Sequence, residues 1–135
     1  MKAVFDTNIL VSALLTPGGT CDRAVRLAVR GALPCAVDSR LVAEYEHVLY
    51  GSAIPIPSEE VDELLDGMRA RAEVVTAPPL GARLPHASDL PFLEVAHAAG
   101  AILVTGNVRH FPKNQRAGVA VMGPDELLDL LREMA

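Results

Sequence analysis

Side chains that carry oxygen atoms stand at the ends of several apolar segments of this sequence. Asp6 directly follows one such segment, and Asn107 comes just after another. Asp89 begins a third, and Glu44 lies within a segment of mixed polarity. If these side chains meet in one crevice, their carboxylates raise each other's pKa unless a cation lies between them. Oxygen ligands favour Mg²⁺ or Mn²⁺ over zinc, and such an ion promotes attack of water on a phosphodiester bond.

Three of these residues also have an ordinary structural interpretation. Asp6 could cap a helix that begins directly after it, a common role for aspartate. The helix that begins near position 89 could be capped by Asp89 itself or by Ser88. Asn107 suits a tight turn after a strand. Taken one at a time, these residues therefore leave both interpretations open.

Glu44 has a rival on its own helix. Residues 40–49 predict a helix with one apolar arc, and Glu44 and Glu46 lie at its two opposite edges. Helical periodicity therefore does not choose between the two glutamates. Either one, taken alone, is best explained as a solvent-exposed residue at the edge of the arc.

The elements that must position these side chains alternate along the chain. Short apolar segments predict strands at residues 2–5, 34–37, 73–76, 101–105 and 119–122. Helices are expected at residues 8–15, 21–30, 40–49, 59–71 and 89–99, and Pro124 opens a last one. Expected helix caps are Thr20, Asp38 or Ser39, and Ser58, with Gly31 and Gly100 as stops. This alternation predicts a parallel sheet covered on both faces by helices, with ligands bound beyond the carboxyl ends of its strands.

The amino-acid composition indicates a folded protein and excludes several other classes. The 135 residues are 50% hydrophobic and 21% charged, which predicts one folded domain and excludes intrinsic disorder. Two cysteines and four scattered histidines give neither a disulfide framework nor a zinc motif. The net charge of −5 argues against indiscriminate binding to nucleic acid. We expect a soluble, cytoplasmic protein, because no apolar stretch is long enough to span a membrane and no signal peptide is present.

Three segments in chain order resemble the motifs of PIN domains, the nuclease fold of VapC-like toxins. They are residues 4–14, with Asp-Thr-Asn after the first strand, residues 89–96, and residues 103–112, with Thr-Gly-Asn and then His-Phe-Pro. Glu44 lies where the family carries its second acid. The resemblance implies a single PIN-like domain over residues 1–135. Its fold would be a three-layer αβα sandwich around a mainly parallel sheet of about five strands.

The resemblance also implies an activity, that of a Mg²⁺- or Mn²⁺-dependent endoribonuclease in a type II toxin–antitoxin system. The residues that match the catalytic and metal-binding positions of the family are Asp6, Glu44, Asp89 and Asn107. Thr105 matches a hydroxyl that orders the site. Asn8 would orient the Asp6 carboxylate by a hydrogen bond without binding the metal itself. Asn107 stands where relatives often have aspartate, and positions 88 and 90, often acidic in relatives, are Ser and Leu. These departures favour one metal ion, or a weak second one, and low activity.

Basic residues near the proposed site suggest where RNA binds, and the resemblance implies the partners. Arg109, Lys113 and Arg116 cluster after the fourth strand, and we expect them to contact RNA phosphates. His110 could pair with a phosphate or cap a turn. A second basic group at positions 23, 26 and 30 shares one helix face and is more simply a solvent-exposed face. The implied partners are an RNA substrate, a cognate antitoxin and a second copy of the chain, bound through apolar surface of residues 8–15 or 59–71.

Other function classes compete with this interpretation. A degenerate PIN domain could bind RNA or an antitoxin without cutting, which the amide at Asn107 favours. A receiver domain needs a lysine after a late strand, and none follows residues 119–122. A haloacid-type phosphatase needs a second aspartate where Asn8 stands. A dinucleotide-binding or P-loop protein needs a glycine-rich loop after the first strand, which this sequence lacks.

Overall fold

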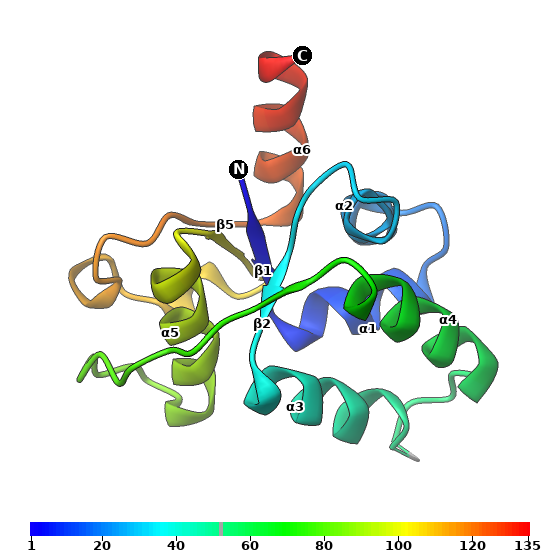
Figure 1. Cartoon of the computed structure of the whole chain (residues 1–135), viewed down its shortest axis with the longest axis horizontal. Coiled ribbons are helices and arrows are strands. Elements are labelled where there is room, and N and C mark those ends of the chain that lie inside the picture. The colour runs from blue at the N-terminus through cyan, green and yellow to red at the C-terminus, as the bar shows by residue number, and fades with distance from the viewer. Residues whose placement is uncertain (52) are drawn as a thin grey trace.

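Five short strands run parallel through the centre of the molecule in the computed structural model, which describes residues 1–51 and 53–135 (Figure 1). The strands are β1 (Ala3–Phe5), β2 (Ala36–Val37), β3 (Glu73–Val74), β4 (Ile102–Val104) and β5 (Val121–Met122). Hydrogen bonds join β1, β4 and β5 in one set and β2 with β3 in another, and the parallel bridge Ala3–Cys35 links the two sets. The resulting order is β3-β2-β1-β4-β5.

The register of β1 and β4 places two residues of the candidate site, Asp6 and Thr105, next to each other. Phe5 pairs with Val104, and the Asp6 N–H continues the ladder with a 2.9 Å bond to the Val104 carbonyl. Asp6 and Thr105 therefore leave the sheet side by side at its carboxyl edge. All three residues of β1 are buried, as expected of a central strand in a sheet covered on both faces.

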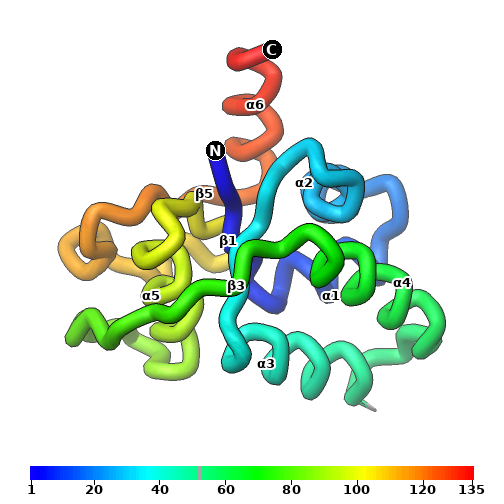
Figure 2. Tube along the Cα trace, in the orientation of Figure 1, coloured from blue at the N-terminus to red at the C-terminus, as the bar shows by residue number. Residues whose placement is uncertain are grey.

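Helices cover the sheet as the alternating pattern predicts. They are α1 (Thr7–Leu15), α2 (Thr20–Val29), α3 (Ser39–Leu49), α4 (Ser58–Arg69), α5 (Leu90–Ala99) and α6 (Pro124–Met134). Figure 1 shows α5 on one side of β1, with α1, α2 and α4 on the other and α3 starting at the end of β2. Figure 2 follows the chain after β3 as it crosses to the α5 side. The α/β class and the layered parallel architecture are confirmed.

Two predicted helix caps are wrong. Thr20 and Ser58 are the first residues of α2 and α4, and the cap positions belong to Gly19 and Pro57, without a capping side chain. At the start of α2 the carboxylate of Asp22 accepts a 2.8 Å bond from the N–H of Gly18, which lies before the helix.

Two other helix ends follow the sequence prediction. Asp38 caps α3 by accepting bonds from the N–H groups of Arg40 and Leu41. Gly100 ends α5 in the left-handed conformation (φ 64°), which glycine adopts without strain.

Several element boundaries differ from the prediction. α4 ends at Arg69, two residues earlier than expected, β3 ends at Val74 and β5 begins at Val121. Both residues of β3 are exposed, because this strand forms an edge of the sheet. The loop before α5 closes with a single 3₁₀ turn (Ala87–Asp89), so that α5 starts one residue later than predicted. Among the described residues, the helices are too short or too polar to cross a membrane.

Candidate active site

Asp6 is the buried carboxylate at the centre of the candidate site, only 5% exposed at the carboxyl end of β1. Its Oδ2 accepts a 2.8 Å bond from the Thr105 hydroxyl and a 3.3 Å bond from Nδ2 of Asn8. Burial raises the pKa of Asp6, and the nearby charge of Asp89 raises it further, against the lowering effect of these hydrogen bonds. Asp6 occupies the cap position of α1, but its side chain caps nothing. The capping interpretation of its carboxylate is therefore wrong.

The turn after β4 is bonded to the start of α1. The Thr105 hydroxyl, which donates to Asp6, accepts a 3.0 Å bond from the N–H of Asn107. Asn8 accepts a 3.0 Å bond from the N–H of Gly106 with Oδ1, while its amide nitrogen donates to Asp6. Thr105 and Asn8 therefore each donate one hydrogen bond to Asp6 and accept one from a backbone N–H of the turn. Together they fix the orientation of the Asp6 carboxylate.

Asp89 lies on the 3₁₀ turn that precedes α5 and makes no capping bond to that helix, so the alternative role as a cap is wrong for this residue too. Its Oδ2 lies 3.1 Å from Nδ1 of His110. His110 therefore contacts a carboxylate, which is neither of the two roles considered from the sequence. The ring of His110 in turn lies against the ring of His86, with 4.3 Å between their centroids.

Glu44 stands apart from the two aspartates. It is exposed on α3, four residues after Arg40, whose guanidinium contacts Glu94 of α5. Residues four apart share a helix face, so Glu44 lies on the side of α3 nearer α5. Within residues 1–51 and 53–135, however, no three His, Cys, Asp or Glu side chains are grouped closely enough to hold a metal ion. Asp89 is near enough to Asp6 for its charge to raise the pKa of Asp6, and Glu44 does not join them in such a group.

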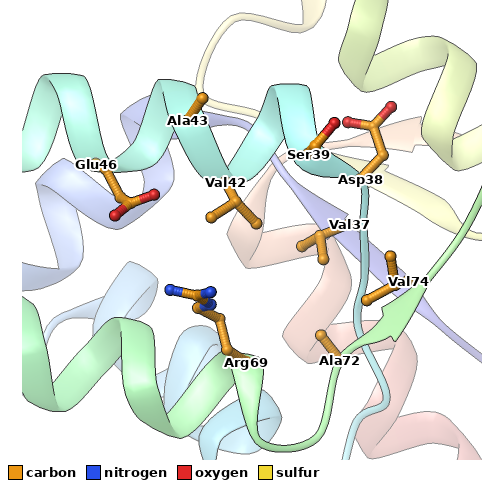
Figure 3. A pocket seen from close by; sticks show the side chains of 9 residues that line it. All are labelled: Val37, Asp38, Ser39, Val42, Ala43, Glu46, Arg69, Ala72 and Val74. Carbon is orange, nitrogen blue, oxygen red and sulfur yellow. The ribbon is translucent and has the colours of Figure 1, made fainter.

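Glu46, the rival of Glu44, lines a different part of the surface. A hollow of about 510 Å³ lies between α3 and α4, with Val37, Val42 and Val74 among its apolar residues. Figure 3 shows Glu46 from α3 and Arg69 from α4 facing each other across it. Neither Asp6 nor Asp89 lines this hollow. The structure thus separates the two glutamates that periodicity alone could not distinguish.

The donors around Asp6 fit a hard divalent cation. Asp6 and Asp89 offer carboxylate oxygens, and repulsion from the charge of Asp89 contributes to the raised pKa of Asp6. A cation between two such carboxylates removes this repulsion, and Mg²⁺ or Mn²⁺ is the ion that oxygen donors select. The partners of Asp6 are an amide and a hydroxyl, with no thiolate among them.

Sequence reasoning missed a buried acid, Glu94, on α5. Glu94 is 4% exposed, and its carboxylate accepts a 2.8 Å bond from Nη1 of Arg40 and a 3.0 Å bond from the N–H of Leu80. Arg40 also contacts Asp38 at 2.8 Å, so one guanidinium joins the cap of α3 to the middle of α5. The available signal was a lone glutamate within the apolar pattern of residues 92–96, because a buried charge requires a partner.

The basic residues expected to meet RNA divide into two kinds. Arg109 and Lys113 are exposed in the segment after β4. Arg116 is partly buried, and its Nε donates a 2.8 Å bond to the carbonyl of Phe111, which closes the same segment on itself. On α2, Arg26 pairs with Asp22 and Glu63.

Comparison with known families gives a direct result. A model of the PIN domain matches residues 2–109, which is most of the chain. A comparison with curated proteins gives no match. The matched range includes Asp6, Glu44, Asp89 and Asn107 and ends before Lys113. This chain belongs to the PIN domain family, whose fold is that of nucleases.

Replacing Asp6 by asparagine should stabilise the metal-free protein. The substitution removes a charge that burial and Asp89 disfavour, and the amide oxygen can still accept the Thr105 bond. We expect Asp6→Asn to raise the Tm by a few degrees at pH 7 in EDTA. The gain should shrink as the pH falls through the raised pKa of Asp6, because the wild-type carboxyl then becomes neutral as well. Asp125→Asn, at an exposed position on α6, serves as the control. A lower Tm for Asp6→Asn at pH 7 would contradict this account.

Replacing Glu94 by glutamine should destabilise the fold. Breaking a buried pair costs about 3–5 kcal/mol, and we expect roughly 2 kcal/mol here because the Arg40 side chain is 42% exposed and keeps Asp38. The measurement is urea unfolding. Glu63→Gln is the matched control, since it removes an exposed partner of Arg26 and should cost less than about 0.5 kcal/mol. An equal decrease in the free energy of unfolding for the two variants would show that the buried Glu94 pair stabilises the fold no more than the exposed one.

Proposed function

We propose that this PIN domain is a metal-dependent endoribonuclease that acts as the toxin of a type II toxin–antitoxin system. The observation that carries the proposal is the pair of carboxylates, Asp6 and Asp89, at the carboxyl edge of a parallel sheet. Burial and mutual repulsion raise the pKa of Asp6, and Asn8 and Thr105 hold its carboxylate in place. Such an environment would suit a cation, and it lies where open α/β sheets bind their ligands.

Each residue has a role in this mechanism. Asp6 and Asp89 would hold a Mg²⁺ or Mn²⁺ ion directly, with Glu44 or Asn107 reaching it through water. Such an ion, when bound, supplies a more acidic water and offsets charge on the scissile phosphate. Thr105 and Asn8 orient Asp6, and His110 orients Asp89 through its 3.1 Å contact. These outer contacts set the direction in which the carboxylates face.

The charges around the site favour one ion over two. Asn107 carries an amide where an aspartate would add a negative charge, and Glu44 is not grouped with the two aspartates. Two carboxylates suffice for an ion that retains several waters, as Mg²⁺ commonly does. The proposed site is therefore a one-metal site with modest activity. Mg²⁺ and Mn²⁺ are both candidates, because both accept oxygen donors.

The proposed partners are RNA, an antitoxin and a second copy of the chain. RNA would lie along Arg109 and Lys113, which are exposed in the segment after β4, with Arg116 shaping that segment. For the protein partners, apolar surface remains on α1, where Leu15 is 52% exposed. Function in the cytoplasm is part of the same proposal, since a toxin of this kind acts on cellular RNA.

A second candidate function is an RNA- or antitoxin-binding module that does not cut. Two observations favour it: the separation of Glu44 from the aspartates and the missing charge at Asn107. Such a module would retain the basic segment after β4 and lose only the chemistry. The two candidates differ in whether RNA is cleaved when a divalent cation is supplied.

The decisive test is cleavage of RNA by the purified chain with Mg²⁺ or Mn²⁺, compared with EDTA. We expect metal-dependent cleavage, and we expect Asp6→Asn and Asp89→Asn each to slow it by about 100-fold or more, since even outer-shell changes cost about 10–100-fold. Glu44→Gln should slow cleavage as well. Glu46→Gln, on the same helix but facing the hollow toward α4, is the matched control and should cut at the wild-type rate. RNA cleavage that continues in EDTA would refute the proposal. Cleavage at the wild-type rate by both Asp6→Asn and Asp89→Asn would refute it as well.

A further inference from the structure

The last helix, α6, carries an apolar stripe that the rest of the chain covers only in part. Leu127, Leu131 and Met134 follow one another at helical spacing and therefore share one face. Leu127 is buried, Leu131 is partly buried and Met134 is 62% exposed. Figure 1 shows the reason, since α6 begins against the body of the molecule and then extends away from it. The outer half of the stripe is therefore open to a partner.

A hollow of about 440 Å³ lies beside α6, on the side of α2. Its lining includes Leu128 of α6 and, from α2, Leu27 with the arginines Arg23, Arg26 and Arg30. The three arginines are spaced three and four residues apart, so they share one face of α2. The hollow thus combines apolar side chains from two helices with three positive charges.

Two of the three arginines have no ionic partner in the part of the chain that the structure describes. Arg26 pairs with Asp22 at 3.0 Å and with Glu63 at 3.3 Å. Arg23 and Arg30 are exposed and form no ion pair with residues 1–51 or 53–135. Although α2 and α6 are in contact, the acids of α6 do not reach these two arginines in the same molecule. Their charge is therefore available to a partner.

The polar side of α6 carries the complementary charge. Its exposed acids are Asp125, Glu126, Asp129 and Glu133, against one arginine, Arg132. Among the described residues, the ion pair that α6 makes is internal and joins Arg132 to Asp129 at 3.6 Å. An α6 helix from another molecule thus offers what the hollow lacks: carboxylates for its free arginines and an open apolar stripe for its leucines.

We propose that α6 of a second copy of the chain binds the hollow beside α2, and that the contact is repeated about a two-fold axis. Acids of each α6 meet Arg23 and Arg30 of the other copy, and the outer stripe of that helix covers Leu27 and Leu128. A two-fold contact needs one surface that carries both halves of the match, and α2 and α6 together form such a surface. This inference rests on the part of the proposed function that includes a second copy, and it assigns that copy to α2 and α6 instead of α1.

Other occupants match only one half of this surface. A nucleic acid could pair with the arginines of α2, but the acids of the adjoining α6 would repel its phosphates and the apolar stripe would stay uncovered. A basic protein could pair with α6, but the arginines of α2 would repel it. A second copy presents acids to the arginines and arginines to the acids, and it covers apolar surface on both sides.

Paired charge reversals test this contact. The α2 variant carries Arg23→Glu with Arg30→Glu, and the α6 variant carries Glu126→Lys with Glu133→Lys. In the proposed dimer, each variant alone brings like charges together at both contacts, whereas a mixture of the two variants restores opposite charges at both. Leu15→Glu, at the exposed apolar end of α1, is the control for a different surface. All five positions are exposed, so the substitutions should leave the fold intact, which thermal melting checks.

Sedimentation velocity measures the oligomeric state, and native mass spectrometry identifies the species in the mixture. We expect dimers for the wild type and for Leu15→Glu. The α2 variant and the α6 variant should each dimerise at least about tenfold more weakly, because like charges then face each other. Their mixture should form a heterodimer with roughly wild-type affinity. Added salt should weaken the wild-type dimer, since it screens exposed ion pairs.

A monomeric wild type, undiminished dimerisation of either charge-reversed variant, or a mixture that does not associate would overturn the inference. A monomeric Leu15→Glu would also overturn it, because the interface would then lie on α1. An α2 variant that still dimerises but no longer binds RNA would overturn it as well and would assign the arginines to nucleic acid. Cleavage of RNA by the wild type is a separate measurement. A monomer that cuts RNA refutes only the interface, and a dimer of this kind that does not cut refutes only the nuclease.

Discussion

Burial of the Asp6 carboxylate at the end of β1 is the constraint on which the rest of the site depends. The parallel pairing of Phe5 with Val104 brings Asp6 and Thr105 out of the sheet together. A carboxylate in that place loses its hydration, and two side-chain donors compensate for part of the cost. Asp89 then adds a second charge that keeps the pKa of Asp6 raised. In the proposed site, a bound cation would remove the remaining cost.

Much of the fold can be predicted from the sequence because its signals are local. Short apolar runs between helical segments specify β1 and β4, and the cap at Asp38 and the stop at Gly100 follow from the chemistry of those residues. The predicted caps at Thr20 and Ser58 are wrong because each helix already begins at that residue, so the cap position falls one residue earlier, at Gly19 and Pro57. The residues of the site differ in the same way, since some have local signals in the sequence and others depend on long-range contacts. Asp6 stands out by its place after a strand, whereas the Asp89–His110 contact and the Arg40–Glu94 pair join residues far apart in the chain.

Long-range contacts of this kind determine where Glu44 can reach. The neighbouring Tyr45 is buried and donates a 2.5 Å bond to the carbonyl of Phe5, the residue before Asp6. Arg40, one turn earlier, is bonded to Glu94 of α5. The helix that carries Glu44 is therefore fixed to both the strand of Asp6 and the helix that follows Asp89. In the proposed site, Glu44 would reach the cation by rotation of its exposed side chain or through a bridging water.

Membership of the PIN domain family agrees with this arrangement, and the central claim is that Asp6 and Asp89 share one divalent cation. The most direct measurement is a crystal structure of the chain grown with Mn²⁺, with anomalous scattering used to locate the ion. We expect a single strong peak within bonding distance of both carboxylates, with Glu44 or Asn107 turned toward it directly or through water. Mn²⁺ bound elsewhere, with Asp6 and Asp89 still bonded only to Thr105, Asn8 and His110, would contradict it.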